Sequence, residues 1–189
     1  MFSFELINNA AEALNAAAEA LTVATDAHRR AVEAFNIATD EAITLEEVYI
    51  SLHAKNIDTA DVAAKKEEAK RRSRMAAIIT EDAADTANAA RKAFTYAKEN
   101  WRLIAEAAMA TLPLYTVVLK SSANTETETF FKEQKGKFFV SFENGRLTLI
   151  APNGATYRSS KAKSYDKSKG VRRVKTANSE FYIFDSIVE

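Results

Sequence analysis

The chain has 189 residues, of which 47% are apolar, and it contains four glycines, two prolines and no cysteine. This composition favours long regular elements around a real core, and it excludes disulfides, thiolate metal sites and cysteine nucleophiles. The net charge of zero hides an asymmetry: residues 1–114 carry 13 Lys and Arg against 18 Asp and Glu, whereas residues 115–189 carry 13 against 8. We therefore expect two different structural parts.

Mostly apolar residues recur every seven positions in the first part of the chain. One series is mostly large and consists of Ile7, Leu14, Leu21, His28, Phe35, Ala42 and Tyr49. A second series follows three places later and is mostly alanine: Ala10, Ala17, Ala24, Ala31, Ala38, Leu45 and Leu52. Such heptads predict a coiled-coil helix over about residues 4–54, and Ser3 is its expected N-cap.

A second heptad pattern predicts another helix over about residues 59–111. Its repeats are Val62, Ala69, Ala76, Ala83, Ala90, Ala97 and Ile104, with Ala87, Phe94, Trp101 and Ala108 offset by four. The turn is expected at residues 55–58, and Asp58 or Thr59 is placed to cap the second helix.

Folding the chain back at Ile57 predicts an antiparallel, alanine-rich helical hairpin over residues 1–113. Alanines then face each other, for example Ala31 and Ala83, which allows the helix axes to approach closely. Opposite charges also face each other in this register: Glu12 with Arg102, Glu19 with Lys98, Arg30 with Asp85, Asp40 with Arg74, and Glu47 with Lys66. Exposed pairs of this kind set the register more than the stability.

Both predicted helices carry a second apolar stripe outside the heptad series. Its larger members are Val23, Ile37, Met75, Ile79, Tyr96 and Leu103. A lone hairpin would expose this stripe to water, so we expect the helices to self-associate into a homo-oligomeric bundle of four or more helices. The alternative is that surface alanines merely raise helix propensity.

After Pro113 the apolar pattern alternates, which predicts a small antiparallel β-domain, sandwich-like or barrel-like, over residues 114–189. Asn144-Gly145 and Asn153-Gly154 are its expected turns. The predicted strands are Leu114–Lys120, Thr127–Lys132, Lys137–Glu143, Arg146–Ile150, Ala155–Ser159, Val171–Lys175 and Glu180–Val188. The predicted fold class is therefore α+β, a long coiled-coil hairpin followed by a β-domain.

A strongly basic segment lies between residues 158 and 175, and we expect it to be a mobile loop. Its cations are Arg158, Lys161, Lys163, Lys167, Lys169, Arg172, Arg173 and Lys175, with Asp166 as the only acid. Phosphate backbones attract such segments by counterion release, so nucleic acid or another polyanion is a candidate ligand. The alternatives are a solubilising loop, or a loop that docks on the acidic hairpin.

Residues 135–142 partly resemble the RNA-recognition signature of RRM domains. The segment departs from that signature where Lys137 replaces an aromatic residue and Phe138 replaces a small one, and the tail shows no helices of the RRM kind. We therefore expect Phe138, Val140 and Phe142 to be core residues.

The two histidines, His28 and His53, give no metal motif. The Glu-x-x-His pattern of di-iron bundles is absent, since Thr25 and Ile50 stand where its glutamates would be. His28 is expected to be a polar residue between the helices that sets their register. We find no nucleotide-binding loop and no Ser/His/Asp set, so no catalytic residue, metal or cofactor is predicted.

The main functional hypothesis is a non-enzymatic interaction and assembly protein, with a rod for self-association and a β-domain that binds a protein partner. An alanine-rich rod with a compact β head resembles bacteriophage accessory and virion attachment proteins. The second hypothesis is a nucleic-acid-binding protein using residues 158–175. The third is a bacteriocin-like toxin, since the hairpin resembles the receptor-binding rods of colicins. Without a signal peptide or a membrane span, we expect a cytoplasmic or virion-associated location and no membrane partner.

Overall fold

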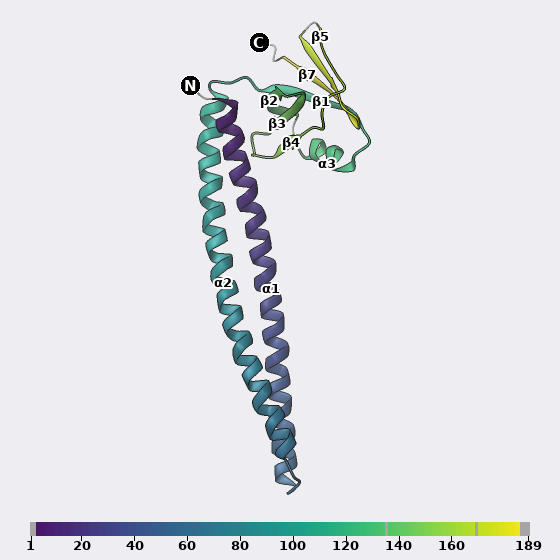
Figure 1. Cartoon of the computed structure of the whole chain (residues 1–189). Coiled ribbons are helices and arrows are strands. Elements are labelled where there is room, and N and C mark those ends of the chain that lie inside the picture. The colour runs from purple at the N-terminus through teal and green to yellow at the C-terminus, as the bar shows by residue number, and fades with distance from the viewer. Residues whose placement is uncertain (1–2, 135, 169, 186–189) are drawn as a thin grey trace. The chain divides into compact units, whose positions relative to one another are not determined.

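The computed structural model describes residues 3–134, 136–168 and 170–185. Two long helices, α1 (Phe4–Ala54) and α2 (Ala60–Met109), are followed by a β-domain (Figure 1). Residues 1–16 and 95–189 together form one compact unit, and residues 17–94 form another. The α+β class and the bounds of the helical hairpin agree with the prediction. The division at residue 113 into parts that fold separately stays a prediction.

Side chains cap the ends of both helices. The Ser3 hydroxyl accepts a hydrogen bond from the backbone N–H of Leu6 at 3.3 Å. The Asp58 carboxylate accepts one from the N–H of Ala60 at 3.0 Å. Between the helices, Asn56 has a φ of 54°, the left-handed conformation that ends many helices. The predicted caps are thus confirmed.

Within residues 17–94 the two helices pack along the predicted heptad positions. We write the heptad so that Phe35 stands at a and Ala31 at d on α1, and Thr80 at a and Ala83 at d on α2. All a and d residues of this unit are buried or half-buried. The Thr80 hydroxyl donates to the Ala31 carbonyl at 3.1 Å, and Thr39 and Ser73 share a hydrogen bond of 3.0 Å. The prediction placed Ala83 opposite Ala31, so the observed register is shifted by less than one turn.

This shift changes which charges meet between the helices. Glu41, not Asp40, pairs across the hairpin, and its partner is Arg72 at 3.0 Å. Glu46, not Glu47, accepts Lys66 at 3.4 Å and Lys70 at 2.6 Å, and these contacts lower the pKa of Glu46, the Lys70 hydrogen bond most.

Another predicted charge pair is also wrong. Arg102 binds Glu99 and Glu106 of its own helix at 2.6 and 2.8 Å. Glu12, its predicted partner, is instead paired with Arg158 of the β-domain. Neighbours three or four residues away on a helix compete for an arginine, and pairing arithmetic between helices does not include them.

The β-domain is built on one seven-stranded antiparallel sheet with the order β4-β3-β2-β1-β7-β6-β5. The strands are β1 (Tyr115–Ser122), β2 (Lys137–Glu143), β3 (Arg146–Ile150), β4 (Thr156–Arg158), β5 (Ser164–Ser168), β6 (Val171–Lys175) and β7 (Ser179–Phe184). Five of the predicted strands, now β1, β2, β3, β4 and β6, are found within two residues of their expected bounds, and the last predicted strand is found as β7. The end predicted for the last one, residues 186–188, lies outside the described residues.

The strand predicted at Thr127–Lys132 is wrong, because this segment forms a helix, α3 (Thr125–Glu133). Asn124 caps it by accepting a hydrogen bond from the N–H of Glu126 at 2.8 Å. Its inward side chains are Thr127, Phe130 and Phe131, which follow the spacing of one helix face rather than strand alternation.

The core of the β-domain consists of large side chains that are almost fully buried. Its members are Val117, Phe138, Leu147, Leu149, Ala151, Val174, Phe181 and Ile183, with Phe130 and Phe131 of α3 packed against them. The ring centroids of Tyr157 in β4 and Phe181 in β7 are 5.6 Å apart, although three strands separate β4 from β7 in the sheet order. The sheet therefore curls on itself, as the barrel-like alternative anticipated.

Candidate functional site

Most of the exposed large apolar side chains in the described residues lie on the two long helices. Val23, Ile37, Met75 and Ile79, all within residues 17–94, expose 52–70% of their surface. Tyr96 and Leu103, in the other compact unit, expose 77% and 54%. The structure therefore places all six predicted self-association residues in contact with solvent.

The four predicted self-association residues within residues 17–94 lie on the same side of the hairpin. Val23, Ile37 and Met75 stand at heptad position c, and Ile79 stands at g. In an antiparallel pair, the g positions of the two helices flank the same side of the a and d contacts. The ion pair between Glu41 and Arg72, both at g, shows this directly. We call the c and g surface of residues 17–40 and 73–94 the apolar face.

The two sides of the helix pair differ in exposure. Every g position in residues 17–94 is exposed, including Ala27 and Ala34. On the opposite side most e positions are half-buried, for example Val32, Thr39 and Glu46. One side is closed by neighbouring side chains, and the other is left open and mainly apolar.

Two charges interrupt the apolar face at position c, Arg30 on α1 and Asp82 on α2. Both are exposed, and within the described ranges neither forms an ion pair, so the predicted pairing of Arg30 with Asp85 is not found. Toward the turn the face ends at the charged pair of Glu41 and Arg72. The face is therefore a bounded apolar surface with one cation and one anion inside it.

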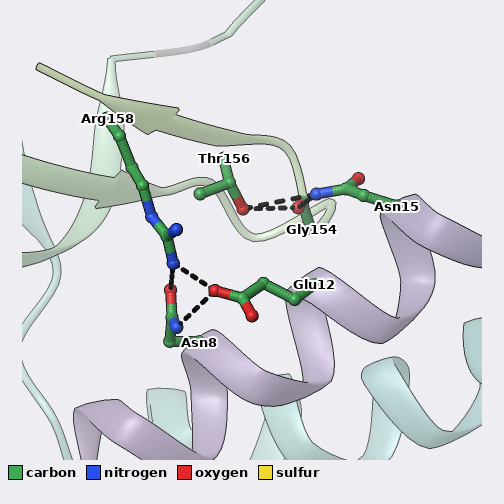
Figure 2. Close-up of polar contacts among 6 residues, drawn as sticks. All are labelled: Asn8, Glu12, Asn15, Gly154, Thr156 and Arg158. Carbon is green, nitrogen blue, oxygen red and sulfur yellow. Dashed lines mark hydrogen bonds and ion pairs between the residues drawn. The ribbon is translucent and has the colours of Figure 1, made fainter.

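In the unit formed by residues 1–16 and 95–189, the helix ends bind the β-domain. Figure 2 shows Arg158 reaching Asn8 and Glu12 of α1, and Asn15 donating to the carbonyl of Gly154 and the hydroxyl of Thr156, both at 3.4 Å. These α1 residues stand at positions b and f, away from the c and g side.

Two further contacts tie the turn at residues 152–154 to the helix ends. The indole N–H of Trp101 donates to the carbonyl of Pro152 at 3.0 Å. Gly154 lies so close that an added Cβ would be 2.6 Å from a Leu14 methyl and 3.3 Å from the Trp101 ring. The turn thus fits against α1 and α2 only because residue 154 has no side chain.

The basic segment is not the predicted loop, because most of it forms the hairpin of β5 and β6. Val174 of β6 is fully buried in the core, whereas every residue of β5 is exposed. Tyr165 stacks on Phe142 of β2 at 4.8 Å between ring centroids. The strand β5 was not predicted because its sequence is rich in serine and lysine. Its aromatic contact is with Phe142 of β2, which is distant in sequence.

The three arginines of the basic segment are engaged by carboxylates. Arg158 pairs with Glu12, and Arg172 lies 3.1 Å from Asp185 and over the ring of Tyr115 at 4.4 Å. Arg173 binds Glu180 at 2.7 Å; this hydrogen bond raises the pKa of the guanidinium and lowers that of the carboxyl. These side chains mainly stabilise the fold, which removes them from a free polyanion surface.

The lysines of the segment remain exposed. They are Lys161, Lys163, Lys167 and Lys175, while Lys169 lies outside the described residues. The backbone N–H of Lys163 donates to the carbonyl of Lys175 at 2.7 Å, so these two residues are neighbours at one end of the β5–β6 hairpin. The exposed basic surface is thus smaller than the sequence suggested.

A groove of about 730 Å³ opens beside Arg158 in the same unit. Its lining includes Glu5, Glu143, Arg146 and Lys161. Because both signs of charge are present on exposed side chains, the groove favours no single charge type.

Other motifs behave as structural residues. Phe138 is fully buried, and Val140 and Phe142 pack against the core, so the prediction that they are core residues is confirmed. His28 is half-buried at position a, and its Nδ1 has no hydrogen-bond partner within the described part of the chain. In that part, no three His, Cys, Asp or Glu side chains gather as metal ligands.

Sequence reasoning missed the contact between the helix ends and the β-domain. Asn8, Asn15 and Glu12 gave no signal of their own, since polar residues at positions b and f normally face water. Trp101 offered the clearest hint, because a buried indole N–H needs an acceptor that an alanine-rich partner helix lacks.

No helix in the described ranges has the length and apolarity needed to cross a membrane. Comparison of the chain with protein-family models, with curated proteins and with solved structures gives no match.

Proposed function

We propose that this is a non-enzymatic assembly protein whose helical hairpin self-associates through the apolar face. The β-domain, in this proposal, is the compact part that binds a further protein partner. The observation that carries the proposal is the exposure of Val23, Ile37, Met75 and Ile79 on one side of residues 17–94.

The identity of these residues argues for burial in a complex. Alanine on a helix surface is explained by its high helix propensity. Valine and isoleucine are not, because β-branched side chains lose rotamer freedom in a helix. Burying such a side chain completely is worth about 1.5–3 kcal/mol, so covering the exposed half of each contributes about 1 kcal/mol. Two copies bury both sets at once.

Sedimentation velocity over a range of concentrations tests this proposal. We expect the wild type to be an oligomer at micromolar concentration. The triple variant Ile37→Gln, Met75→Gln, Ile79→Gln should sediment as a monomer with unchanged helical circular dichroism, because glutamine keeps the helix propensity and removes the apolar surface.

The chain offers a matched control in three other exposed isoleucines. Ile43, Ile50 and Ile78 expose 52–58% of their surface but stand at positions b and f, outside the apolar face. The triple Gln variant of these residues should keep the wild-type oligomeric state. A wild-type monomer at every concentration, or dissociation caused by the control set alone, would contradict the proposal.

A second candidate function is polyanion binding by the β5–β6 hairpin. The supporting observation is the exposure of Lys163, Lys167 and Lys175, which have no acidic partner within the described residues. Their triple Glu variant should abolish binding to single-stranded DNA or RNA. The same change at three hairpin lysines, Lys55, Lys92 and Lys98, is the control.

The salt dependence of this binding gives a second readout. Phosphate contacts require that affinity falls steeply as salt rises, through counterion release. Binding that does not change with salt, or that survives the triple Glu variant, would exclude this function.

A further inference from the structure

The hairpin has a definite way to pair with a second copy, given the proposed self-association. The evidence is the position of two charged residues, Arg30 and Asp82. Arg30 stands at c on α1 between Val23 and Ile37, and Asp82 stands at c on α2 between Met75 and Ala89. Charges inside an apolar contact are costly unless they meet a partner. Within the described residues neither has an ion-pair partner in its own chain.

Arg30 and Asp82 lie at the same level along the helix pair. The hydrogen bond between Thr39 and Ser73, 3.0 Å long, fixes one level of the antiparallel pair. Two residues further from the turn on each helix are Ile37 and Met75. One heptad beyond these come Arg30 and Asp82. Equal steps along two antiparallel helices keep residues level with each other.

A two-fold dimer through this face has two possible orientations. If the symmetry axis crosses the helices at the level of Arg30, then α1 packs on α1 of the second copy, and Arg30 meets Arg30 while Asp82 meets Asp82. If the axis runs along the helices, α1 packs on α2 of the second copy. Arg30 then meets Asp82 of the second copy, and this contact occurs twice.

We propose that a second copy of this chain binds the apolar face with its hairpin turn at the same end, so that Arg30 and Asp82 form two ion pairs between copies. Ile37 then faces Met75 of the second copy, and Val23 faces Ala89. Every helix has antiparallel neighbours in the resulting four-helix bundle, which suits ordinary bundle packing.

In the unit that contains the helix ends, the β-domain leaves this side of the helices open. Arg158 and Gly154 contact Asn8, Glu12 and Asn15 at positions b and f. Tyr96 and Leu103, at position c, remain more than half exposed. The β-domain therefore does not cover the c side there.

Charge reversal on the full-length protein tests the orientation. Arg30→Glu alone places two like-charge pairs in each dimer, and so does Asp82→Arg alone. We expect each single variant to raise the dimer dissociation constant by about tenfold or more. The double variant should recover wild-type affinity, and an equimolar mixture of the two single variants should form heterodimers, because both pairs are then complementary.

The matched controls are Asp85→Arg and Lys92→Glu, which reverse exposed charges at position f. They should leave the dimer unchanged. If the single changes at Arg30 and Asp82 have no larger effect than these controls, or if the mixture does not form heterodimers, the orientation is wrong.

A distance measurement separates failure of the orientation from failure of self-association. Because the chain has no cysteine, Ser51→Cys gives one spin label per copy near the turn. The proposed dimer predicts about 20–30 Å between labels, whereas the crosswise dimer predicts about 60 Å from a helical rise of about 1.5 Å per residue. A dimer with the long distance overturns this inference alone. A protein that is a monomer throughout overturns the proposed function as well.

Discussion

The hairpin in residues 17–94 and the β-domain distribute their apolar side chains in opposite ways. Among buried apolar residues, the hairpin unit has only alanines, namely Ala24, Ala69 and Ala87. Its large apolar residues are half-buried at the heptad positions, for example Phe35 and Phe94, or more than half exposed, for example Ile37 and Ile79. The β-domain instead buries large side chains almost completely, for example Phe138, Leu147 and Ile183.

This difference indicates how each part of the molecule is stabilised. Alanine contacts bring helices close but remove little apolar area from water, so each contributes little free energy. Buried Phe138 and Phe181 remove far more area each. The β-domain can be stable by its own core, whereas the hairpin gains most from a further surface.

The largest effect should come from a cavity in the β-domain core. Phe181→Ala removes a fully buried ring and should lower the free energy of unfolding by about 3–5 kcal/mol. Phe94→Ala in the hairpin removes a half-buried ring and should cost clearly less. Urea titrations followed by circular dichroism measure both. Equal costs for the two changes would contradict the contrast.

The next effect concerns protein concentration. If the hairpin is stabilised by association, a tenfold increase in concentration adds about 1.4 kcal/mol to a dimer, by mass action. The helical signal at 222 nm should therefore melt at a higher temperature at higher concentration. The near-ultraviolet aromatic signal, which reports Trp101 against the 152–154 turn and the four tyrosines of the β-domain, should move less. Identical shifts, or none, would remove the distinction.

A smaller effect is expected where the β-domain meets the helix ends. Gly154→Ala must accept a φ of 90° and a contact with Leu14, and should cost about 2–3 kcal/mol. Gly170→Ala is the matched control, because its φ is 77° but nothing lies within 4 Å of the added Cβ. Backbone strain alone should cost about 1–2 kcal/mol. Trp101 fluorescence reports the local loosening.

The contrast also explains what could be predicted from the sequence. The hairpin follows from local, periodic information, so the heptads located both helices and the turn. Its register was less certain, because alanine fits against alanine at several offsets and Arg102 has closer partners in its own helix. Small side chains therefore determine that the two helices pack together, but they do not determine the exact axial register between them.

The β-domain depends on contacts between distant residues, and the prediction erred where local signals were weak. Thr125–Glu133 has alternating threonine and glutamate, which resembles a strand until Phe130 and Phe131 are read together with Thr127. The β5 strand carries one aromatic residue, Tyr165, whose partner Phe142 is far away in sequence. The apolar face was found because it needs only helix periodicity, whereas the contacts of Asn8 and Glu12 needed the fold.

The smallest expected effect is the pH dependence of exposed carboxylates. In the β-domain the Arg173 hydrogen bond holds the pKa of Glu180 below its ordinary value of 4.5. In the hairpin, Lys70 and Arg71 do the same for Glu46 and Glu68.

Because each pKa is lowered on folding, each contribution to stability is complete above pH 4.5 and is lost as the pH falls through the lowered value. The two long helices have three such groups, because the Arg102 hydrogen bond likewise lowers the pKa of Glu99, against one in the β-domain, so the stability of the helices should fall more between neutral pH and acid. Glu46→Gln should reduce the acid sensitivity of the helical signal, and Glu180→Gln should reduce that of the aromatic signal. If either change alters both signals equally, the two parts unfold as one unit, and the contrast between them describes packing but not independent stability.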